Sequence, residues 1–367
     1  MTIPFVDLKA QYLSIKSEVD EAVGSVFESS VFVGGKFVSE FEKQFSQLYG
    51  IDNCVGVGNG TDALFLALKA VGIGTGDEVI TPAHSWISTA ETISLTGASP
   101  VFADVDKATY TITPEAIKSK INTKTKAVIV VHIYGQAAPV KEIAKLCKQY
   151  NLFLIEDCSQ AHLTEENNEL VGRFGTAAAF SFYPTKNLGA YGDAGCVITA
   201  DNDLALKIRR LANHGGLHKD EHVIEGTNSR LDSLQAAVLS VKLRYLRAWT
   251  DKRIQNALLY NSLLRDERNV TLPFVRPGTK HSFHLFVIKA KHRDELKSFL
   301  QIQGIQTMIH YPTALPFEQA YGYLNHKKEE FPIAVKLSQQ ILSLPIYPEL
   351  SVEQLKYVCE QIVFFYR

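Results

Sequence analysis

Residues 152–162 read LFLIEDCSQAH, and residues 178–189 read AAFSFYPTKNLG. Each stretch begins as a short apolar run of strand length and ends in polar residues. Asp157 directly follows the first run, and Lys186 follows the second inside a turn rich in Pro and Gly. In a parallel α/β sheet, ligands bind beyond the carboxyl ends of the strands. The two stretches therefore predict a carboxylate and a lysine at one rim of such a sheet.

The remainder of the first 245 residues alternates apolar runs with amphipathic helical patterns, which is typical of α/β proteins with a parallel sheet. The predicted strands are Glu78–Thr81, Pro100–Ala103, Ala127–His132, Leu152–Glu156, Ala178–Phe182 and Cys196–Thr199. The predicted helices include Ala63–Val71, Val140–Tyr150 and Leu204–Asn213. The strand ends place further polar and aromatic residues at the same rim, namely His84, Ser85, Trp86 and Tyr134.

Composition changes near residue 245, so we predict two domains, residues 1–245 and residues 246–367. A long helix over Leu243–Leu264 would bridge them. The smaller unit is predicted to contain a strand at His284–Lys289, a helix at Glu295–Gln303 and a strand at Gln306–His310. Residues 314–328 read as a loop with short turns.

Composition also excludes several classes of function. The 38 basic and 39 acidic side chains nearly cancel, and no basic stripe indicates nucleic acid binding. No apolar run approaches the roughly 20 residues that span a bilayer, and the start lacks the pattern of a signal peptide. The five cysteines are scattered without a CxxC pair. We therefore expect a cytoplasmic protein with reduced thiols and no metal site.

A lysine opposite a carboxylate is the pair of groups that pyridoxal 5′-phosphate (PLP) enzymes need most. The lysine holds the cofactor as an imine, and the carboxylate keeps the pyridine nitrogen protonated, so that the ring draws electrons. A lysine held inward at this turn would have a lowered pKa, which favours imine chemistry. The alternatives are a solvated surface lysine at Lys186 and a helix cap at Asp157. The pair predicts a PLP enzyme of the aminotransferase kind.

Residues 55–64 read VGVGNGTDAL and pass from an apolar segment through glycines into a helical pattern. Thr61 or Asp62 is the predicted N-cap, and free amides at a helix start bind phosphate. Thr61 stands where a dinucleotide fingerprint needs glycine, and no Gly-Lys-Ser/Thr of a P-loop follows. A tight turn without a ligand is the alternative. Because Asp157 and Lys186 accompany the loop, we favour a site for the cofactor phosphate.

These motifs together resemble the DegT/DnrJ/EryC1/StrS family of sugar aminotransferases, which are PLP enzymes of the aspartate aminotransferase fold type. The resemblance runs from Phe5 almost to the C-terminus. It implies a three-layer αβα fold with a smaller C-terminal α+β domain. Besides the segments already quoted, the resemblance rests on Phe32–Gly35, Gly60–Leu64, Asn228–Asp232 and His310–Pro312.

The resemblance implies a role for each matched residue. Lys186 would carry the cofactor, Asp157 would pair with its ring nitrogen, Gln160 would lie near the ring hydroxyl, and Trp86 would stack on the ring. The phosphate would be held by Gly60, Thr61, Asp62 and Ser181, together with Asn228 from the second subunit of a homodimer. The implied active site is thus shared between two chains. Substrate contacts are assigned to His162, Tyr183, His218, Lys219, His310 and Tyr311.

Four of these assignments have structural alternatives. Trp86 could be a core aromatic residue, and Asn228 could cap the helix that begins near Leu231. Tyr311 before Pro312 could be a packed turn residue, and His162 could be a structural histidine.

Substrate choice rests on fewer residues. The segment His218–His222 resembles that of enzymes acting at C3 of dTDP-linked 3-keto-6-deoxyhexoses, where cations help to hold the diphosphate. The alternative for His218 and Lys219 is a solvated loop without a ligand. Leu163 and Phe317 depart from the family pattern in ways that could reshape the sugar pocket. Because Lys186 is not replaced by the histidine of dehydrating relatives, we expect transamination.

The prediction is therefore a dTDP-sugar 3-aminotransferase that takes its amino group from glutamate. Its product would serve nucleotide-sugar biosynthesis for a surface glycan, such as the O-antigen of lipopolysaccharide, or for a glycosylated metabolite. The alternatives are a 4-aminotransferase acting on a 4-keto nucleotide sugar, and a non-catalytic binding or regulatory protein with the same fold.

Overall fold

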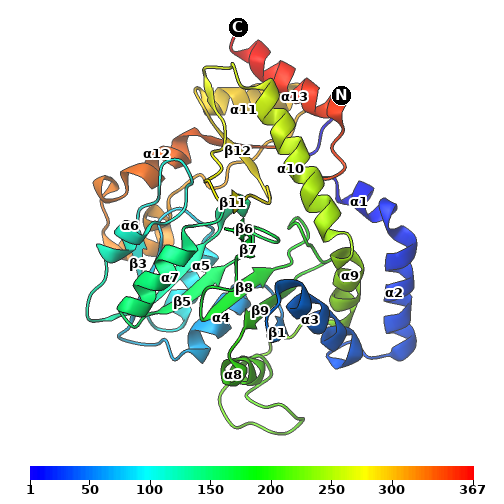
Figure 1. Ribbon diagram of the computed structural model, residues 1–367, viewed down its shortest axis with the longest axis vertical. Helices are drawn as coiled ribbons and strands as arrows, with labels where there is room; N and C mark the ends of the chain where they lie inside the picture. Colours follow the sequence, from blue (N-terminus) through cyan, green and yellow to red (C-terminus); the bar gives the residue numbers. More distant parts are fainter.

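The computed structural model describes residues 1–367 and is built around one seven-stranded sheet (Figure 1). The strands lie in the order β1-β9-β8-β5-β4-β2-β3. Strand β9 runs antiparallel to both of its neighbours, and the five strands from β8 to β3 are parallel. Their bounds are β1 Asn53–Val57, β2 Glu78–Pro82, β3 Ser99–Ala103, β4 Thr125–Val131, β5 Phe153–Asp157, β8 Ala177–Ser181 and β9 Gly195–Thr199. The predicted mostly parallel sheet is confirmed.

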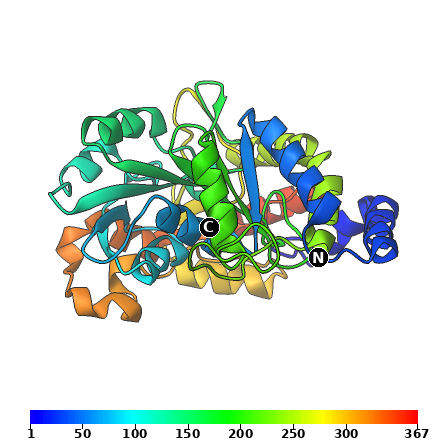
Figure 2. The same ribbon diagram turned by 90° about the horizontal axis from the view of Figure 1, so that it is seen from below.

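Helices cover both faces of this sheet and complete three layers (Figure 2). One face packs against α3 (Gly35–Tyr49), α7 (Val140–Gln149) and α9 (Ser233–Leu243). The other packs against α4 (Gly60–Ala70), α5 (Ser88–Leu95) and α8 (Asn202–Ala212). In β8, Ala178 and Phe180 point into the first core, whereas Ala177 and Ala179 point into the second. Because successive strand residues face opposite sides, a strand buried on both faces reads as an unbroken apolar run.

The C-terminal part forms a separate core around a three-stranded sheet of order β10-β12-β13. The strands are β10 Val270–Thr271, β12 Phe286–Ala290 and β13 Ile341–Leu344, and the helices are α10 Leu246–Leu263, α11 Arg293–Ile302, α12 Pro332–Gln340 and α13 Val352–Phe365. Ile3 is fully buried in this core and forms an isolated bridge with Ile305. The first residues therefore pack with the C-terminal core, and the division at residue 245 stays a prediction.

The remaining elements are short or peripheral. They are α1 Leu8–Ser14, α2 Lys16–Ser29, α6 Pro114–Lys118, the 3-10 turn at Ile133–Gly135, and a small sheet of β6 Glu165–Glu166, β7 Glu169–Leu170 and β11 Thr279–Lys280. Three 3-10 turns occupy Leu315–Phe317, Gln319–Leu324 and Lys328–Glu330, which confirms a loop with short turns there. None of the helices has the length and apolar character needed to cross a membrane.

All six strands predicted for the first 245 residues occur within two residues of their predicted bounds. The long helix predicted over Leu243–Leu264 is confirmed as α10, Leu246–Leu263. Two other expectations were wrong. Strand β1 was missed, because its glycines were read only as the start of a loop. Residues 306–310 form no strand, and only Met308 bridges to Ser343.

A buried carboxylate ties three neighbouring strands together. Glu156 has no exposed surface, and its side-chain oxygens accept hydrogen bonds from the backbone N–H groups of Gly172, Phe174 and Gly175 at 2.7–2.8 Å. The same carboxylate lies 3.0 Å from Nε2 of His132, just beyond β4. Because Gly175 lies two residues before β8, Glu156 holds that strand beside β5, next to Asp157.

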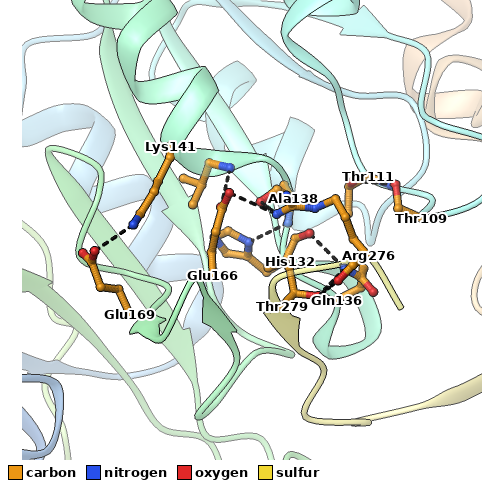
Figure 3. A network of polar contacts seen from close by, with 12 residues as sticks. Thr109, Thr111, His132, Gln136, Ala138, Lys141, Glu166, Glu169, Arg276 and Thr279 are labelled. Atoms are coloured by element: carbon orange, nitrogen blue, oxygen red, sulfur yellow. Dashed lines mark hydrogen bonds and ion pairs between the residues drawn. The ribbon is translucent and has the colours of Figure 1, made fainter. Parts of the chain in front are cut away.

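A second polar network extends from His132 to the small sheet (Figure 3). His132 Nδ1 accepts from the backbone N–H of Ala138 at 3.1 Å. Glu166 is nearly fully buried, pairs with Arg276 at 3.2 Å and accepts from the N–H of Val140 at 2.9 Å. These contacts join the β6–β7 hairpin, the segment before β11 and the start of α7 into one unit.

The Glu156 contacts generate a stability prediction. Glu156→Ala leaves three N–H groups and His132 without their acceptor, so we expect a loss of about 3–5 kcal/mol in the free energy of unfolding. Urea denaturation of the cofactor-free protein measures this loss. Glu142→Ala, at an exposed site on α7 without a side-chain hydrogen bond, is the control and should change stability by about 0.5 kcal/mol or less. Equal stability of the two variants would contradict the role assigned to Glu156.

Candidate active site

A cavity of about 660 Å³ opens at the carboxyl ends of β5 and β8, beside the start of α4. Residues from β4, β5, β8, α4, the segment after β2 and the C-terminal unit meet here, as expected for ligand sites in α/β sheets. The structure brings eleven of the predicted site residues to its wall: Gly60, Thr61, Asp62, Trp86, Asp157, Gln160, Ser181, Tyr183, Lys186, His310 and Tyr311. Four predicted residues lie elsewhere: His162, His218, Lys219 and Asn228.

Lys186 lies in the turn that follows β8, where its N–H donates to the carbonyl of Tyr183 at 2.8 Å. Burial lowers the pKa of its ammonium to about 8, and the negative charge of Asp157 partly opposes this shift. A lysine with this pKa supplies free amine near neutral pH, which imine formation and proton transfer both require. Lys242 has an equally lowered pKa through burial but does not line the cavity. The functional assignment therefore rests on placement as well as on the pKa.

Asp157 ends β5 and is nearly buried. Its Oδ1 accepts from the N–H of Ser159 at 3.0 Å, while Oδ2 has no hydrogen-bond partner in the protein. The side chain is thus held by one oxygen and presents the other to a ligand. A partner that donates a proton, such as a protonated ring nitrogen, suits this oxygen.

The start of α4 forms an anion cradle. Asn59 is the N-cap, because its Oδ1 accepts from the N–H of Asp62 at 2.8 Å, so the prediction of Thr61 or Asp62 as cap was wrong. Asp62 instead accepts from Ser229 Oγ at 2.6 Å and from Asn59 Nδ2 at 3.0 Å. A Cβ atom at Gly60 would lie 2.5 Å from Cβ of Ser181. Glycine therefore lets the helix start approach the end of β8, where its free N–H groups can bind phosphate.

Aromatic side chains border the cavity on another side. Trp86 is 57% exposed, which rules out the alternative in which it is a core aromatic residue. Its ring centroid lies 5.5 Å from that of Tyr311. Gln160 donates from Nε2 to the Tyr311 hydroxyl at 2.9 Å, and its Oε1 accepts from the N–H of Tyr134 at 2.7 Å. These bonds fix Tyr311 and leave the face of Trp86 open to a planar ligand.

Two predicted rim residues lie behind this wall. His84 Nε2 and the Tyr134 hydroxyl are 2.6 Å apart, and both residues are buried. Tyr134 also hydrogen-bonds the carbonyl of His310. Burial, with a smaller contribution from His310, lowers the pKa of His84 to about 4. The pair therefore supports the wall as neutral groups and does not line the cavity.

His162 is fully buried, and its ring lies 5.5 Å from Phe180 and 5.7 Å from Phe182. Neither ring nitrogen has a hydrogen-bond partner. Burial, followed by the charge of Lys186, lowers the pKa of His162 to about 3. The predicted substrate contact is thus contradicted, because a ring packed between phenylalanines is out of reach of a ligand.

The segment between α8 and α9 carries the other three displaced residues. His218, Lys219 and Asn228 are all exposed and lie outside the cavity of their own chain. Figure 1 shows this segment as a loop beyond α8. Asn228 does not cap the following helix, because the N-cap of α9 is Asp232. It forms instead a backbone bridge with Asn213.

Sequence reasoning missed several residues of the wall. Ser159 lies two residues after Asp157, a spacing that offered a signal. His284 comes from the C-terminal unit, where its Nδ1 lies 3.3 Å from Asn187 Oδ1, and burial holds its pKa well below the usual range. No spacing in the sequence connects His284 with Lys186. Other wall residues that were not predicted include Asn59, Ser88, Thr185 and Asp193, whereas Ser85 was expected at the rim and lies there.

This wall fits the phosphate and ring of PLP. It offers the Lys186 amine, an Asp157 oxygen without a partner in the protein and the exposed indole face of Trp86. It also offers the start of α4, which glycine at position 60 allows to lie close to the end of β8. Fold and site together define a PLP-dependent aminotransferase. The chain belongs to the DegT/DnrJ/EryC1/StrS aminotransferase family, whose model matches residues 13–363. This family is PLP-dependent, and the cofactor prediction is confirmed.

Three relatives illustrate the range of similar proteins. The pleiotropic regulatory protein of Geobacillus stearothermophilus is 44% identical over 100% of this chain and 99% of its own. The dTDP-3-amino-3,6-dideoxy-alpha-D-galactopyranose transaminase of Aneurinibacillus thermoaerophilus is 42% identical over 98% of both chains. The UDP-N-acetyl-3-dehydro-alpha-D-glucosamine 3-aminotransferase of Acidithiobacillus ferrooxidans is 40% identical over 96% of this chain and 95% of its own.

Among solved structures, S. venezuelae DesV in complex with a ketimine intermediate matches with a TM-score of 0.97 at 39% identity. The match covers 99% of this chain and 98% of that chain. The predicted three-layer fold and the prediction of an enzyme are thereby confirmed.

The pKa of Lys186 yields a testable prediction. In the cofactor-free protein, labelling of Lys186 by an amine-selective reagent should rise with a midpoint near pH 8 instead of 10.5. In Asp157→Asn the midpoint should move lower, because the lost carboxylate favoured the ammonium form. Mass spectrometry of peptides measures both. Lys242 is the internal control, since its pKa is also lowered by burial but Asp157 does not contribute to it. A midpoint that rises in Asp157→Asn would contradict the assigned pairing.

Proposed function

We propose that this protein transfers an amino group from glutamate to C3 of a dTDP-linked 3-keto-6-deoxyhexose. The observation that carries the proposal is the shared cavity wall of Lys186, Asp157 and the start of α4. The proposed sugar position draws support from relatives named as 3-amino-sugar transaminases. The product would enter nucleotide-sugar biosynthesis in the cytoplasm for a surface glycan or a glycosylated metabolite.

The residues divide the work as follows. PLP, when bound, supplies the electron sink that stabilises negative charge on the substrate carbon. The Lys186 amine would take a proton from the donor's α-carbon as general base and would return it to the C4′ atom of the cofactor as general acid. Asp157 Oδ2, which has no partner within the protein, would accept a hydrogen bond from the ring nitrogen and so would hold a proton there. The α4 N–H groups and Ser181 bind the phosphate, and the indole of Trp86 excludes water from one ring face.

We propose that the active site is completed in a homodimer. Apolar side chains near the N-terminus are exposed in the single chain, with exposed fractions of 57% for Phe27, 44% for Phe32 and 49% for Val33. Such a cluster is typical of an interface. Asn228, exposed and without a capping role, would reach the phosphate in the cavity of the second subunit.

The same loop supplies the proposed nucleotide contacts. His218 and Lys219 are exposed on the segment that carries Asn228, and neither forms an ion pair within the chain. A diphosphate can accept hydrogen bonds from a free lysine ammonium and from an imidazole N–H. Tyr183, which is 53% exposed at the cavity, and His310 and Tyr311 would contact the sugar.

The substrate proposal is tested by half-reactions of the PLP-loaded enzyme. Glutamate should remove the visible absorbance of the lysine-linked cofactor, and a dTDP-linked 3-keto-6-deoxyhexose should restore it. Lys186→Ala should show neither change, because it lacks the amine that carries the cofactor and moves the proton; Lys145→Ala, at an exposed site on α7, is the control.

Other outcomes separate the alternatives. Recovery only with the 4-keto sugar would retain the chemistry and overturn the C3 assignment. Recovery with UDP-linked but not dTDP-linked sugars would overturn the assigned nucleotide. No response to glutamate or to other amino donors would point to a binding or regulatory protein.

The loop proposal is tested by His218→Ala combined with Lys219→Ala. Loss of the diphosphate contacts should raise KM for the nucleotide sugar about tenfold or more, and the glutamate half-reaction should stay nearly unchanged. Steady-state and single half-reaction kinetics measure both values. Lys145→Ala again serves as control for the loss of a surface cation. An equal loss in both half-reactions would assign the loop to the cofactor or to folding.

A further inference from the structure

A second concave site lies away from the catalytic cavity, at the contact between the loop after β3 and the C-terminal unit. It has a volume of about 510 Å³, within the range of small-molecule sites. We call it the basic hollow, because its wall contains five cations: Lys107, Arg268, Lys289, Lys291 and Lys336. Cations make up 38 of the 367 residues of the chain but five of the twelve residues that line this hollow.

These cations come from separate parts of the chain. Lys107 follows β3, Arg268 precedes β10, and Lys336 lies on α12. Lys289 belongs to β12, and Lys291 follows it directly. These residues are far apart along the chain, and only the tertiary structure brings their side chains together. Figure 1 shows α12 beside the β3 side of the molecule and close to β12.

The positive charge of the hollow is only partly compensated by the protein. None of its five cations forms an ion pair, and no Asp or Glu lines it. Asp106 lies near the hollow, and its charge raises the pKa of Lys289, while its side chain also accepts from the N–H groups of Ala108 and Thr109 at 2.8 Å. Glu267 accepts from the N–H of Asn269 at 2.9 Å. The whole chain has a formal charge of −1, so the excess of positive charge is a local property of the hollow.

The wall is also held in place. Asp104 accepts from the N–H groups of Ile333 and Ala334 at 2.9 Å and so fixes the start of α12 to the end of β3. Lys289 is half-buried, donates to the carbonyl of Lys107 at 3.3 Å, and lies 5.7 Å from the Tyr110 ring centroid. Burial and the charge of Lys336 lower the pKa of Lys289. The charge of Asp106 opposes only part of this effect. Five cations held together with partial compensation favour an anionic ligand.

We propose that the basic hollow binds a small molecule with a chain of at least two phosphate groups, such as a nucleoside triphosphate. Clustered lysines act as point charges for phosphate oxygens, and Thr271 and Gln340 add neutral donors at the same wall. Ile333 and Leu337 offer an apolar side next to the cations for a nucleoside. A ligand here would bridge the loop after β3 and α12. The site is separate from the catalytic one and does not depend on the proposed substrate.

The test is titration calorimetry of the PLP-loaded enzyme with two probes, inorganic tripolyphosphate and ATP. The test variant carries Lys107→Gln and Lys336→Gln, both at exposed positions. The control carries Lys145→Gln and Lys148→Gln, which remove two exposed cations from another hollow of about 360 Å³. We expect the test variant to weaken tripolyphosphate binding about tenfold or more, and the control to change it less than about twofold.

Binding should also weaken as salt is added, because exposed charges are screened over about 8 Å at physiological ionic strength. Tighter binding of ATP than of tripolyphosphate would assign the apolar side to a nucleoside, and equal binding would limit the ligand to its phosphate chain. Equal affinities in the test and control variants would overturn the proposal, as would no binding by the unmodified protein at millimolar probe. Arg268→Gln with Lys291→Gln, on the β10 and β12 side, repeats the test if the first variant does not fold.

Discussion

The buried carboxylate of Glu156 is the interaction on which the catalytic geometry depends. It accepts three backbone N–H groups from the segment before β8 and contacts His132 beyond β4. It thereby aligns the strand that ends in Asp157 with the strand that leads to Lys186. A buried charge is costly unless it is fully hydrogen-bonded, so this arrangement is stable only in one register. The next residue, Asp157, faces the other side of the sheet and is left with one oxygen for a ligand.

Burial determines which titratable groups of the active site carry a charge. Burial lowers the pKa of Lys186 to about 8 and so provides free amine at the pH where the cell works. The histidines beside it, including His310 with a pKa of about 4, stay neutral and add no positive charge. The phosphate site depends on close packing of the backbone, because Gly60 lets the start of α4 come close to Ser181. The phosphate site therefore depends on the absence of a side chain as much as on hydrogen-bond donors.

The chain shows two distinct uses of positive charge. In the catalytic cavity a single lysine is desolvated and opposed by one carboxylate, which suits covalent chemistry. In the basic hollow several lysines remain charged and partly hydrated, which suits reversible binding of phosphates. The exposed loop with His218 and Lys219 is of the second kind. Only a second subunit would bring it to a cavity, so the proposed nucleotide contacts and the proposed dimer depend on each other.

The sequence by itself determined the strands, the lysine, the carboxylate and the glycine loop, because each is a local pattern of burial or backbone conformation. It also favoured the family, since its motifs occur in order along most of the chain. It assigned the helix cap to Thr61 or Asp62, although side-chain geometry selects Asn59, and it left the role of His162 open until packing against Phe180 and Phe182 resolved it. Only the tertiary structure brought His284 to Lys186 and gathered the cations of the basic hollow. Contacts between segments that are distant along the chain leave no periodicity in the sequence.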